Sequence, residues 1–367
     1  MTDRRNFLLY PLSLVFGFVT GFRNFLYNSR ILPSTKFSTP VICVGNITVG
    51  GTGKTPFTEY LIELLQTQFK VAVLSRGYKR TSSGFTVVTA ASTVSEAGDE
   101  PLQIARKFPD AVVVVDRNRK NGIKQIIKLF PETEVILLDD AFQHRQITPG
   151  FSILLTDFNR LMTRDSMLPY GNLRESISNV RRANVIIITK SPVNMSFMRG
   201  RFVMNEINKS PHQNIFFTSV KYNSPKPLFE TDNLSEPDFS NPEHTGIVLV
   251  TGIANPRPFK ELIEKIACEV IHLQYPDHYK FNEDDIATIN ESFTKLKSPV
   301  KYIITTEKDS VRLKEFTSIT APIYYFPIGI DFLYDYKNEF DKIITDYVMQ
   351  HSADYKQVMQ NIIEINL

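Results

Sequence analysis

The chain has 367 residues, of which 42% are hydrophobic and 22% are charged. That length suffices for two domains, and the apolar fraction is that of a globular protein with a buried core, which excludes a disordered chain. A formal net charge of +3 and only two cysteines argue against nucleic-acid binding, a disulfide framework and a cysteine-based metal site.

Residues 1–36 differ from the rest of the chain. Residues 6–22 carry no charged side chain and are rich in Phe and Leu, while Arg4 and Arg5 precede them and Arg23 follows. A helix that crosses a bilayer needs about 20 apolar residues, whereas this run is shorter and contains Pro11. A helix on a membrane surface is therefore favoured, and a single span or a helix packed on the core remain alternatives. The apolar side chains would share one side of that helix, namely Leu14, Val15, Phe18, Phe22, Phe25 and Leu26.

Residues 41–56 read VICVGNITVGGTGKTP and have the layout of a phosphate-binding loop. A short apolar strand leads into a glycine-rich turn, and a helix begins near Lys54. Backbone N–H groups can surround a phosphate where no Cβ intrudes, and the helix start adds further N–H groups and the positive end of its dipole. We expect nucleotide contacts from Thr48, Val49, Gly50, Gly51, Thr52, Gly53, Lys54 and Thr55.

Two side chains of this loop carry specific expectations. Lys54 should reach the β- and γ-phosphates, and the Thr55 hydroxyl should bind Mg²⁺. One departure from the usual pattern is Thr48, which stands where that pattern has glycine. An ordinary glycine-rich turn between a strand and a helix is the alternative.

Short apolar strands alternate with helices after this loop. Such alternation predicts a parallel sheet covered on both faces, with ligands beyond the carboxyl ends of the strands. The expected helices are 56–66 and one beginning near residue 102. The expected strands are 71–74, 86–88, 111–115, 135–138, 153–156 and 185–188.

Acidic residues follow two of these elements. Asp139 and Asp140 end the strand VILLDD, where a carboxylate can hold Mg²⁺ opposite the Lys54–Thr55 turn. Asp99 precedes a helix in a Gly-Asp-Glu-Pro turn, so it is either a helix cap or a base that deprotonates an attacking hydroxyl. His144 follows the Asp pair closely and is either structural or close to the phosphates.

Basic residues gather at two strand ends and are candidates for binding phosphates of nucleotide or substrate. They are Arg76, Lys79, Arg80, Arg117, Arg119 and Lys120. Some of them should only be solvated. His278, by itself, gives little indication of catalysis.

A second block begins after a polar segment. Residues 222–244 are rich in Pro, Asn, Ser and acids and read as a connector or hinge. Strands at 247–251, 270–273, 302–305 and 323–326 and a helix at 258–267 then indicate a smaller α/β lobe. Residues 334–367 look helical. The predicted organisation is a helix at 1–36, a P-loop lobe at 37–221, the connector, a lobe at 245–333 and a helical segment at 334–367.

Nine ordered strings between residues 41 and 313 resemble the tetraacyldisaccharide 4′-kinase (lipid A 4′-kinase) family. They are VGNITVGGTGKTP, LSRGYKR, GDEP, VVVDRNR, LLDDAFQHR, LPYGNLRE, TGIANPRPF, YPDHYKF and TTEKDSVRL. The family's own loop also accounts for Thr48. Asn172 and Ser176 stand where the family usually has proline, which puts the rigidity of that loop in question.

The resemblance implies an α/β fold of two α/β/α lobes with the active site in the cleft between them and a membrane-associated N-terminal helix. It implies transfer of the γ-phosphoryl group of ATP, with Mg²⁺, to the 4′-hydroxyl of an acylated glucosamine disaccharide 1-phosphate in lipid A (lipopolysaccharide) biosynthesis. The location implied is the cytoplasmic face of the bacterial inner membrane.

The resemblance also assigns residues. It makes Asp99 the acid that deprotonates the hydroxyl, His278 its support and Lys54 the phosphate-binding lysine. The implied metal site comprises Thr55, Asp139, Asp140 and Glu175. The implied substrate contacts are Ser75, Arg76, Tyr78, Arg119, Gln143, His144 and Arg174, and residues 306–309 resemble a turn that recognises the base.

One alternative function shares the loop, the Asp pair and the surface helix. It is a membrane-associated P-loop NTPase switch that acts on a protein partner and has no small-molecule acceptor. A kinase needs a hydroxyl-activating pair such as Asp99 and His278, and a switch does not.

Overall fold

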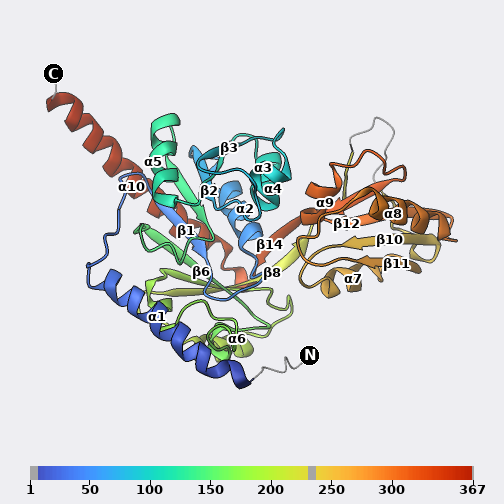
Figure 1. The fold of residues 1–367 in the computed structure, drawn as a ribbon, viewed down its shortest axis with the longest axis horizontal. Coiled ribbons are helices and arrows are strands. Elements are labelled where there is room, and N and C mark those ends of the chain that lie inside the picture. The colour runs from blue at the N-terminus through green and yellow to red at the C-terminus, as the bar shows by residue number, and fades with distance from the viewer. Residues whose placement is uncertain (1–6, 230–236, 366–367) are drawn as a thin grey trace. The chain divides into compact units, whose positions relative to one another are not determined.

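The computed structural model describes residues 7–229 and 237–365, with side chains up to residue 352. Arg4, Arg5 and Asn6 of the predicted surface helix lie outside the described residues. The chain forms two compact units (Figure 1). Unit 1 comprises Met1–Ala97, Ile104–Val220 and Ile330–Leu367, and unit 2 comprises Gly98–Gln103 and Lys221–Gly329. Each unit has its own sheet, so the predicted α/β class is confirmed.

Unit 1 is built on a nine-stranded sheet, counted over the described residues. Its spatial order is β14 (Ile328–Phe332), β8 (Asn214–Tyr222), β7 (Val185–Thr189), β6 (Phe151–Asp157), β1 (Val41–Gly45), β5 (Val135–Asp139), β2 (Val71–Ser75), β4 (Val112–Val115) and β3 (Thr86–Val88). The pairs from β8 to β4 are parallel, and β3 is antiparallel to β4. The carboxyl ends of the parallel strands therefore lie at one edge of the sheet.

The helices of unit 1 are α1 (Tyr10–Asn28), α2 (Lys54–Leu65), α3 (Val94–Ala97), α4 (Asp99–Lys107), α5 (Arg119–Leu129), α6 (Phe197–Ile207) and α10 (Lys337–Ile365), with short 3₁₀ turns at Phe7–Leu9, Met162–Arg164, Ile177–Arg182 and Leu333–Asp335. The first residues of α4 belong to unit 2.

The strands of unit 1 are buried on both faces. Ile123 of α5 and Val203 of α6 share a core with the side chains of one face. On the other face, Phe340 of α10 packs within 5.6 Å of Phe57 of α2 and 5.5 Å of Phe216 of β8, measured between ring centroids. Two covered faces explain the continuous apolar runs from which the strands were predicted.

Helix α1 has its polar side inward and its apolar side outward. Ser13 and Asn24 are its buried residues, and the Ser13 hydroxyl donates to the carbonyl of Met167 at 3.0 Å. Phe18 and Phe22 are 74% and 54% exposed. Among the described residues, Phe7–Asn28 is the one helix that is long and apolar enough to cross a membrane, a criterion of length and composition alone.

Unit 2 carries a five-stranded sheet, again counted over the described residues. Its order is β11 (Glu269–Gln274), β10 (Thr245–Thr251), β12 (Val300–Thr306), β13 (Ile323–Phe326) and β9 (Lys226–Pro227), all parallel except β9. Helix α8 (Glu283–Lys295) packs on one face and α7 (Arg257–Ile263) on the other, while α9 (Glu307–Leu313) directly follows β12.

Three predicted elements differ from those observed. Helix α4 begins at Asp99 rather than near residue 102, and α7 ends at Ile263 rather than residue 267. The predicted connector is also partly regular. Its first residue ends β8, Lys226–Pro227 pairs with β13 and Pro242–His244 forms a 3₁₀ turn. Residues 230–236 of that connector lie outside the described residues.

Candidate active site

The loop between β1 and α2 folds as a strand–turn–helix unit. Gly50 and Gly53 have φ angles of +96° and +83°, which lie in the left-handed region that favours glycine. A Cβ added to Gly50 would also lie 2.8 Å from the Arg160 guanidinium. Thr48 is 2% exposed, and its backbone forms a bridge with that of Leu173. The residue at 48 therefore serves to pair this loop with a second one.

Neighbouring segments hold the loop from outside. The Val49 N–H donates to the Asn172 carbonyl at 2.8 Å, and Arg160 donates to the Val49 carbonyl at 2.5 Å. The Asn172 side chain donates in turn to Asp165 at 2.9 Å. Hydrogen bonds of Asn172 therefore hold the loop that carries it, at a position where the family usually has proline.

The loop also bonds to itself and to the end of β7. The Asn46 amide donates to the Thr52 hydroxyl at 2.7 Å, and Thr189 donates to the Thr52 carbonyl at 2.8 Å. Lys190 donates to the Gly51 carbonyl. Carbonyl oxygens of the loop thus point at hydrogen-bond donors.

The amides of the loop differ from its carbonyls. Within the described part of the chain, the N–H groups of Gly50, Gly51, Thr52 and Gly53 have no hydrogen-bond acceptor. Helix α2 follows immediately, and its first N–H groups lack intrahelical partners by geometry. A row of unbonded amides at the positive end of a helix dipole is suited to bind phosphate.

Two carboxylates lie at the carboxyl end of β5, beside the loop. Asp139 lies opposite Val44 in the parallel register, which places it next to the start of the loop. Asp140 has a φ angle of +47°, a left-handed conformation that costs a non-glycine residue about 1–3 kcal/mol and tends to occur at functional sites. Its carboxylate lies 3.6 Å from the Lys54 ammonium and 3.3 Å from the Arg174 guanidinium. Burial raises the pKa of Asp140, but Lys54 and Arg174 outweigh it and lower this pKa overall.

The other carboxylate faces hydroxyl groups. The hydroxyls of Thr58 and Ser75 both lie 3.4 Å from carboxylate oxygens of Asp139, which is 1% exposed. Arg119 is equally buried and donates to the backbone carbonyls of Asp116 and Asp139 at 2.9 and 3.2 Å. Burial lowers the pKa of Arg119 to about 10. Arg119 therefore connects the ends of β4 and β5. A direct contact between Arg119 and the substrate stays a prediction.

The remaining predicted substrate residues of unit 1 lie near the same edge. Gln143 donates to the Asn46 carbonyl of the loop at 2.7 Å. Burial, followed by the charges of Arg119 and Arg76, lowers the pKa of His144 to about 4, so its imidazole is neutral at physiological pH. Arg76 and Tyr78 are exposed beyond the end of β2.

Glu175 contacts basic and amide groups. Its side chain is fully buried and lies 2.6 Å from the Arg182 guanidinium. Asn24 of α1 donates to the same carboxylate at 3.2 Å. The structure therefore connects Glu175 to α1, and its predicted role as a metal ligand stays untested.

Unit 2 brings together two residues that are distant in sequence. His278 Nδ1 lies 2.7 Å from a carboxylate oxygen of Asp99, across 179 positions of sequence. His278 has a φ angle of +57°. On its other side, His278 Nε2 lies 2.9 Å from the Lys308 ammonium, which also pairs with Asp277 at 3.0 Å.

These contacts define the protonation pattern of the pair. An ammonium only donates hydrogen bonds, so Nε2 of His278 is the acceptor and Nδ1 carries the proton donated to Asp99. Asp99 is 6% exposed. Burial raises its pKa, whereas the hydrogen bond from His278 and the charges of Lys308 and Arg312 outweigh burial and lower it. Asp99 is therefore a carboxylate at neutral pH, as a base must be.

The predicted base-recognition turn begins α9. Thr306 caps this helix through the Asp309 N–H, and its hydroxyl donates to the Asp309 carboxylate at 2.6 Å. Asp309 also accepts from the Gly252 N–H at 2.8 Å and from Arg312 at 2.7 Å. Recognition of the nucleobase of ATP by this turn stays a prediction. Lys308, which lies within the turn, contacts His278.

Comparison with known proteins identifies the family. The model of the family described as tetraacyldisaccharide-1-P 4′-kinase (LpxK) matches residues 5–349. The chain belongs to this family. The tetraacyldisaccharide 4′-kinase of Bacteroides thetaiotaomicron is 43% identical over 357 residues, which cover 94% of each chain. That of Phocaeicola vulgatus is 44% identical over 360 residues, covering 94% of this chain and 96% of the relative.

A solved structure agrees in fold. The crystal structure of LpxK from Aquifex aeolicus in complex with ATP superposes with a TM-score of 0.72 at 27% identity, covering 93% of this chain and 98% of that one. The predicted family is thereby confirmed, as is the predicted activity of a kinase in lipid A biosynthesis.

Two residues near the phosphate loop were not predicted from the sequence, and a third, Lys308, was predicted in a different role. Lys190 directly follows β7, so the rule that ligands lie beyond strand ends was a signal that could have found it. Arg160 gave no comparable signal, and Lys308 was predicted only as part of the turn at residues 306–309. Both take their position from contacts between segments that are far apart in sequence, at 111 and 30 positions.

Proposed function

We propose that this kinase transfers the γ-phosphoryl group of ATP to the 4′-hydroxyl of a tetraacylated glucosamine disaccharide 1-phosphate. The observation that carries the proposal is the 2.7 Å contact between Asp99 and His278. Such a pair prepares a hydroxyl for attack, and an NTPase switch has no need of it.

The donor belongs to unit 1. The unbonded amides of residues 50–53 receive the β- and γ-phosphates, and Lys54 leaves Asp140 to neutralise them. The Lys54 ammonium lies 3.6 Å from the Asp140 carboxylate, so the carboxylate attracts it without forming a tight hydrogen bond. Lys54 can therefore move to the phosphates. Electrostatic stabilisation and positioning account for most of the catalysis of phosphoryl transfer.

The oxygen donors beside the loop fit Mg²⁺. This ion prefers hard oxygen ligands and usually takes one or two carboxylates together with water and substrate phosphates. Thr55, Asp139 and Asp140 supply such a set. No cluster of three or more His, Cys, Asp or Glu residues suited to a metal occurs among the described residues, which agrees with a site completed by the nucleotide. When bound, Mg²⁺ would offset charge on the phosphates. We assign Glu175, paired with Arg182, to support of the site instead.

The acceptor chemistry belongs to unit 2. Asp99 takes the proton of the 4′-hydroxyl. The 4′-oxygen then forms a bond to the γ-phosphorus, while the bond between that phosphorus and the bridging oxygen breaks and ADP leaves. His278 orients Asp99 through its Nδ1–H, and Lys308 holds the histidine in that tautomer. General-base catalysis of this kind contributes about 10²–10⁴-fold. It stays a prediction that ATP bound by unit 1 and the acceptor hydroxyl bound by unit 2 meet at one site.

The remaining predicted residues would bind the sugar and its 1-phosphate. Neutral His144 and the Gln143 amide supply hydrogen bonds, and Arg174 and exposed Arg76 supply positive charge. We also propose that α1 keeps the enzyme on the cytoplasmic surface of the inner membrane. Its apolar side faces outward while Ser13 and Asn24 face the protein, the reverse of a helix packed on a soluble core.

One experiment separates the kinase from the switch. The full chain is incubated with γ-labelled ATP, with and without tetraacyldisaccharide 1-phosphate in detergent micelles, and label is followed in lipid and in free phosphate. We expect labelled lipid and little free phosphate without acceptor, and we expect Asp99→Asn to lose the labelled lipid. Lipid-independent release of phosphate with no labelled lipid would instead indicate the switch.

A further inference from the structure

Helix α6 presents an unusual outer face. Its inner side packs through Gly200, Val203 and Ile207, and a Cβ added to Gly200 would lie 2.7 Å from the Tyr334 hydroxyl. Met198 and Phe202, four residues apart, lie on the opposite side and are 71% and 70% exposed. Large apolar side chains thus occupy the side of α6 that faces away from the protein.

The same face is cationic. Arg199 and Arg201 are exposed on α6, and the Arg199 guanidinium lies 5.0 Å from the ring centroid of Phe158. Glu206, the one acidic residue of this helix, is bonded to Arg164 at 2.6 and 2.8 Å. Its charge is therefore offset, and the helix is left with unbalanced positive charge.

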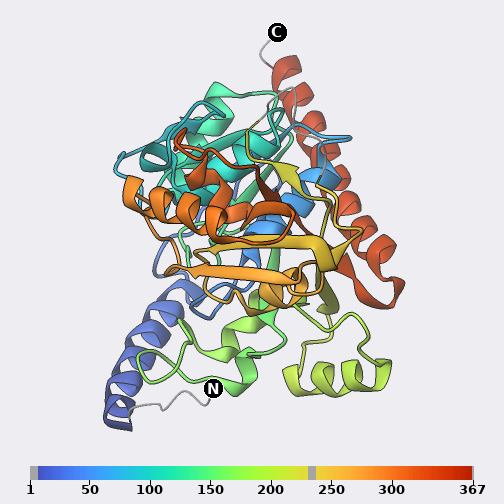
Figure 2. The ribbon, with the colours of Figure 1, turned by 90° about the vertical axis from the view of Figure 1, so that its right-hand side faces the viewer.

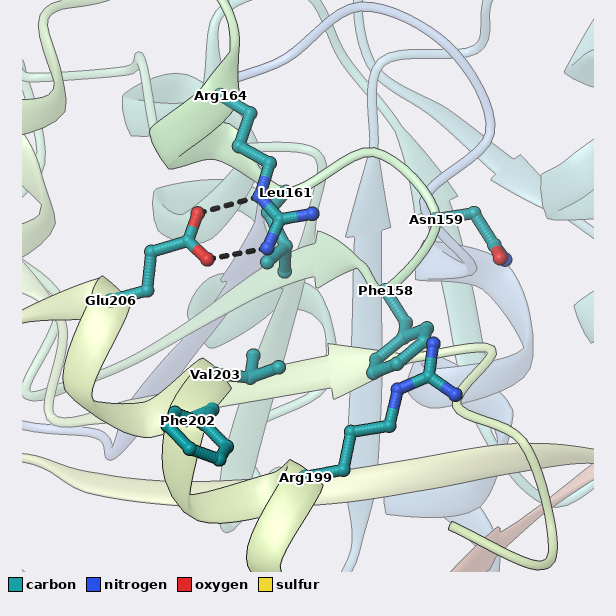
Figure 3. Close-up of a pocket in the computed structure, with 8 residues that line it drawn as sticks. All are labelled: Phe158, Asn159, Leu161, Arg164, Arg199, Phe202, Val203 and Glu206. Carbon is teal, nitrogen blue, oxygen red and sulfur yellow. Dashed lines mark hydrogen bonds and ion pairs between the residues drawn. The ribbon is translucent and has the colours of Figure 1, made fainter.

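A pocket opens beside the helix (Figure 3). It has a volume of about 350 Å³ and is lined by Phe158, Asn159, Leu161, Arg164, Arg199, Phe202, Val203 and Glu206. Figure 3 shows Arg199 extending across Phe158 and the Arg164–Glu206 pair at the other side. The lining therefore combines apolar rings with guanidinium groups, which suits an anionic amphiphile.

The position of α6 agrees with that of α1. Figures 1 and 2 share their vertical axis, and both place α6 and the N-terminal half of α1 at the lower end of unit 1. Figure 2 shows them on opposite sides of that end. The unit thus has two separate helices with exposed apolar residues at one end.

We propose that α6 is a second membrane contact, which binds the surface of an anionic phospholipid bilayer. Met198 and Phe202 enter the boundary between headgroups and acyl chains, while Arg199 and Arg201 bind lipid phosphates. The pocket accommodates part of one such lipid. This inference rests on the proposed membrane location of α1 and adds a contact that fixes the orientation of unit 1 on the bilayer.

The charge of the face decides the choice of occupant. Two copies of α6 facing each other would bring Arg199 and Arg201 of both copies together, and like charges repel. An anionic surface attracts the same residues, and apolar side chains interleaved with arginines are typical of interfacial helices.

The test is co-sedimentation of the full chain with vesicles of phosphatidylglycerol and phosphatidylcholine, compared with vesicles of phosphatidylcholine alone. Each basic residue near an anionic surface contributes about five-fold to partitioning. Arg199→Gln/Arg201→Gln should lower the partition coefficient about 25-fold on the mixed vesicles and barely change it on the neutral ones. Met198→Ser/Phe202→Ser should lower it about ten-fold or more on both.

Matched controls lie on α5, where Lys124, Lys128 and Leu129 are exposed. Lys124→Gln/Lys128→Gln and Leu129→Ser should sediment like the parent. Each variant must also keep the parent's melting temperature and its turnover of micellar substrate. Equal losses in the α5 and α6 variants, or no loss in the α6 variants, would overturn the proposal. A change of oligomeric state in Met198→Ser/Phe202→Ser without a change in lipid binding would identify a second copy as the occupant.

A variant of α1 separates this inference from the proposed anchor. Phe18→Ser/Phe22→Ser changes only exposed positions of α1 and should reduce binding to both kinds of vesicle. Loss of binding in that variant with none in the α6 variants leaves the anchor standing and refutes a role for α6. The reverse result refutes the anchor and keeps the α6 contact.

Discussion

Lys308 offers the sharpest test of the proposed acceptor chemistry. Its ammonium lies 2.9 Å from His278 Nε2, and His278 Nδ1 lies 2.7 Å from Asp99. In Lys308→Met the histidine loses the donor that keeps Nε2 unprotonated, so the tautomer that supports Asp99 is no longer enforced. Lys308→Arg restores a charged donor, and Lys308→Gln restores a neutral one.

The size of the effect follows from this contact. A hydrogen bond to a charged group contributes about 1.5–3 kcal/mol. The Lys308 side chain is 23% exposed and shares its charge with Asp277, which places the effect at the lower end of that range. A loss of about 1.5 kcal/mol corresponds to about a ten-fold fall in kcat. That is smaller than the 10²–10⁴-fold expected for loss of a general base.

The pH dependence supplies a second readout. His278, Lys308 and Arg312 together lower the pKa of Asp99, and burial opposes them. Removing the Lys308 charge therefore raises the pKa of Asp99. Because the base must be deprotonated, activity on the acid side should be lost at a higher pH in Lys308→Met than in the parent. If Lys308 only bound a substrate phosphate, Lys308→Met would instead raise KM and leave the acid limb of the pH profile unchanged.

The assay measures initial rates at saturating ATP and acceptor from pH 5 to 9, with ¹⁵N shifts of the His278 ring nitrogens to report the tautomer. Lys295→Met is the matched control, since Lys295 lies in the same unit and forms an exposed pair with Glu291 at 2.8 Å. Parent turnover, an unmoved acid limb and an unchanged tautomer in Lys308→Met would refute the reasoning.

Three further outcomes are expected. Asp99→Asn should lower kcat about 10²–10⁴-fold while the Kd for ATP, measured by calorimetry, stays within two-fold, because the phosphate loop belongs to unit 1; a weakened Kd would contradict the base assignment. Lys54→Met should reduce both kcat and ATP affinity in the same two assays, and parent values of both would exclude a phosphate contact. Glu175→Gln should destabilise the fold by about 1.5–3 kcal/mol in urea unfolding, since it removes the charge that is hydrogen-bonded to the partly buried Arg182; a ligand-only role would leave the unfolding midpoint unchanged.

The phosphate loop was readable from the sequence because its determinants are consecutive. A buried strand, glycines at positive φ and the start of a helix lie within 16 residues, and local backbone geometry decides their arrangement. Asp139 was predictable for a related reason, since a parallel register places residues at strand ends side by side.

The residues that act on the acceptor hydroxyl could not be predicted in this way. Physical reasoning left Asp99 undecided between a helix cap and a base, and His278 gave little indication of a role. The contact that joins them spans 179 positions, and only the family resemblance connected them in advance. Lys308 was read as part of a base-recognition turn, because sequence alone does not show which way a side chain at the start of a helix points.

The orientation of α1 also needed the structure, since spacing identified its apolar side and left open whether that side faces the core. Its polar side makes contacts that lead into the phosphate loop. Arg23 donates to the Gln143 carbonyl at 3.4 Å, and the Gln143 amide donates to the Asn46 carbonyl at 2.7 Å. Asn46 in turn donates to the Thr52 hydroxyl inside the loop. A helix that served only as an anchor would need no such chain of hydrogen bonds. These contacts place the polar side of α1 next to Gln143, whose side chain is bonded to the start of the phosphate loop.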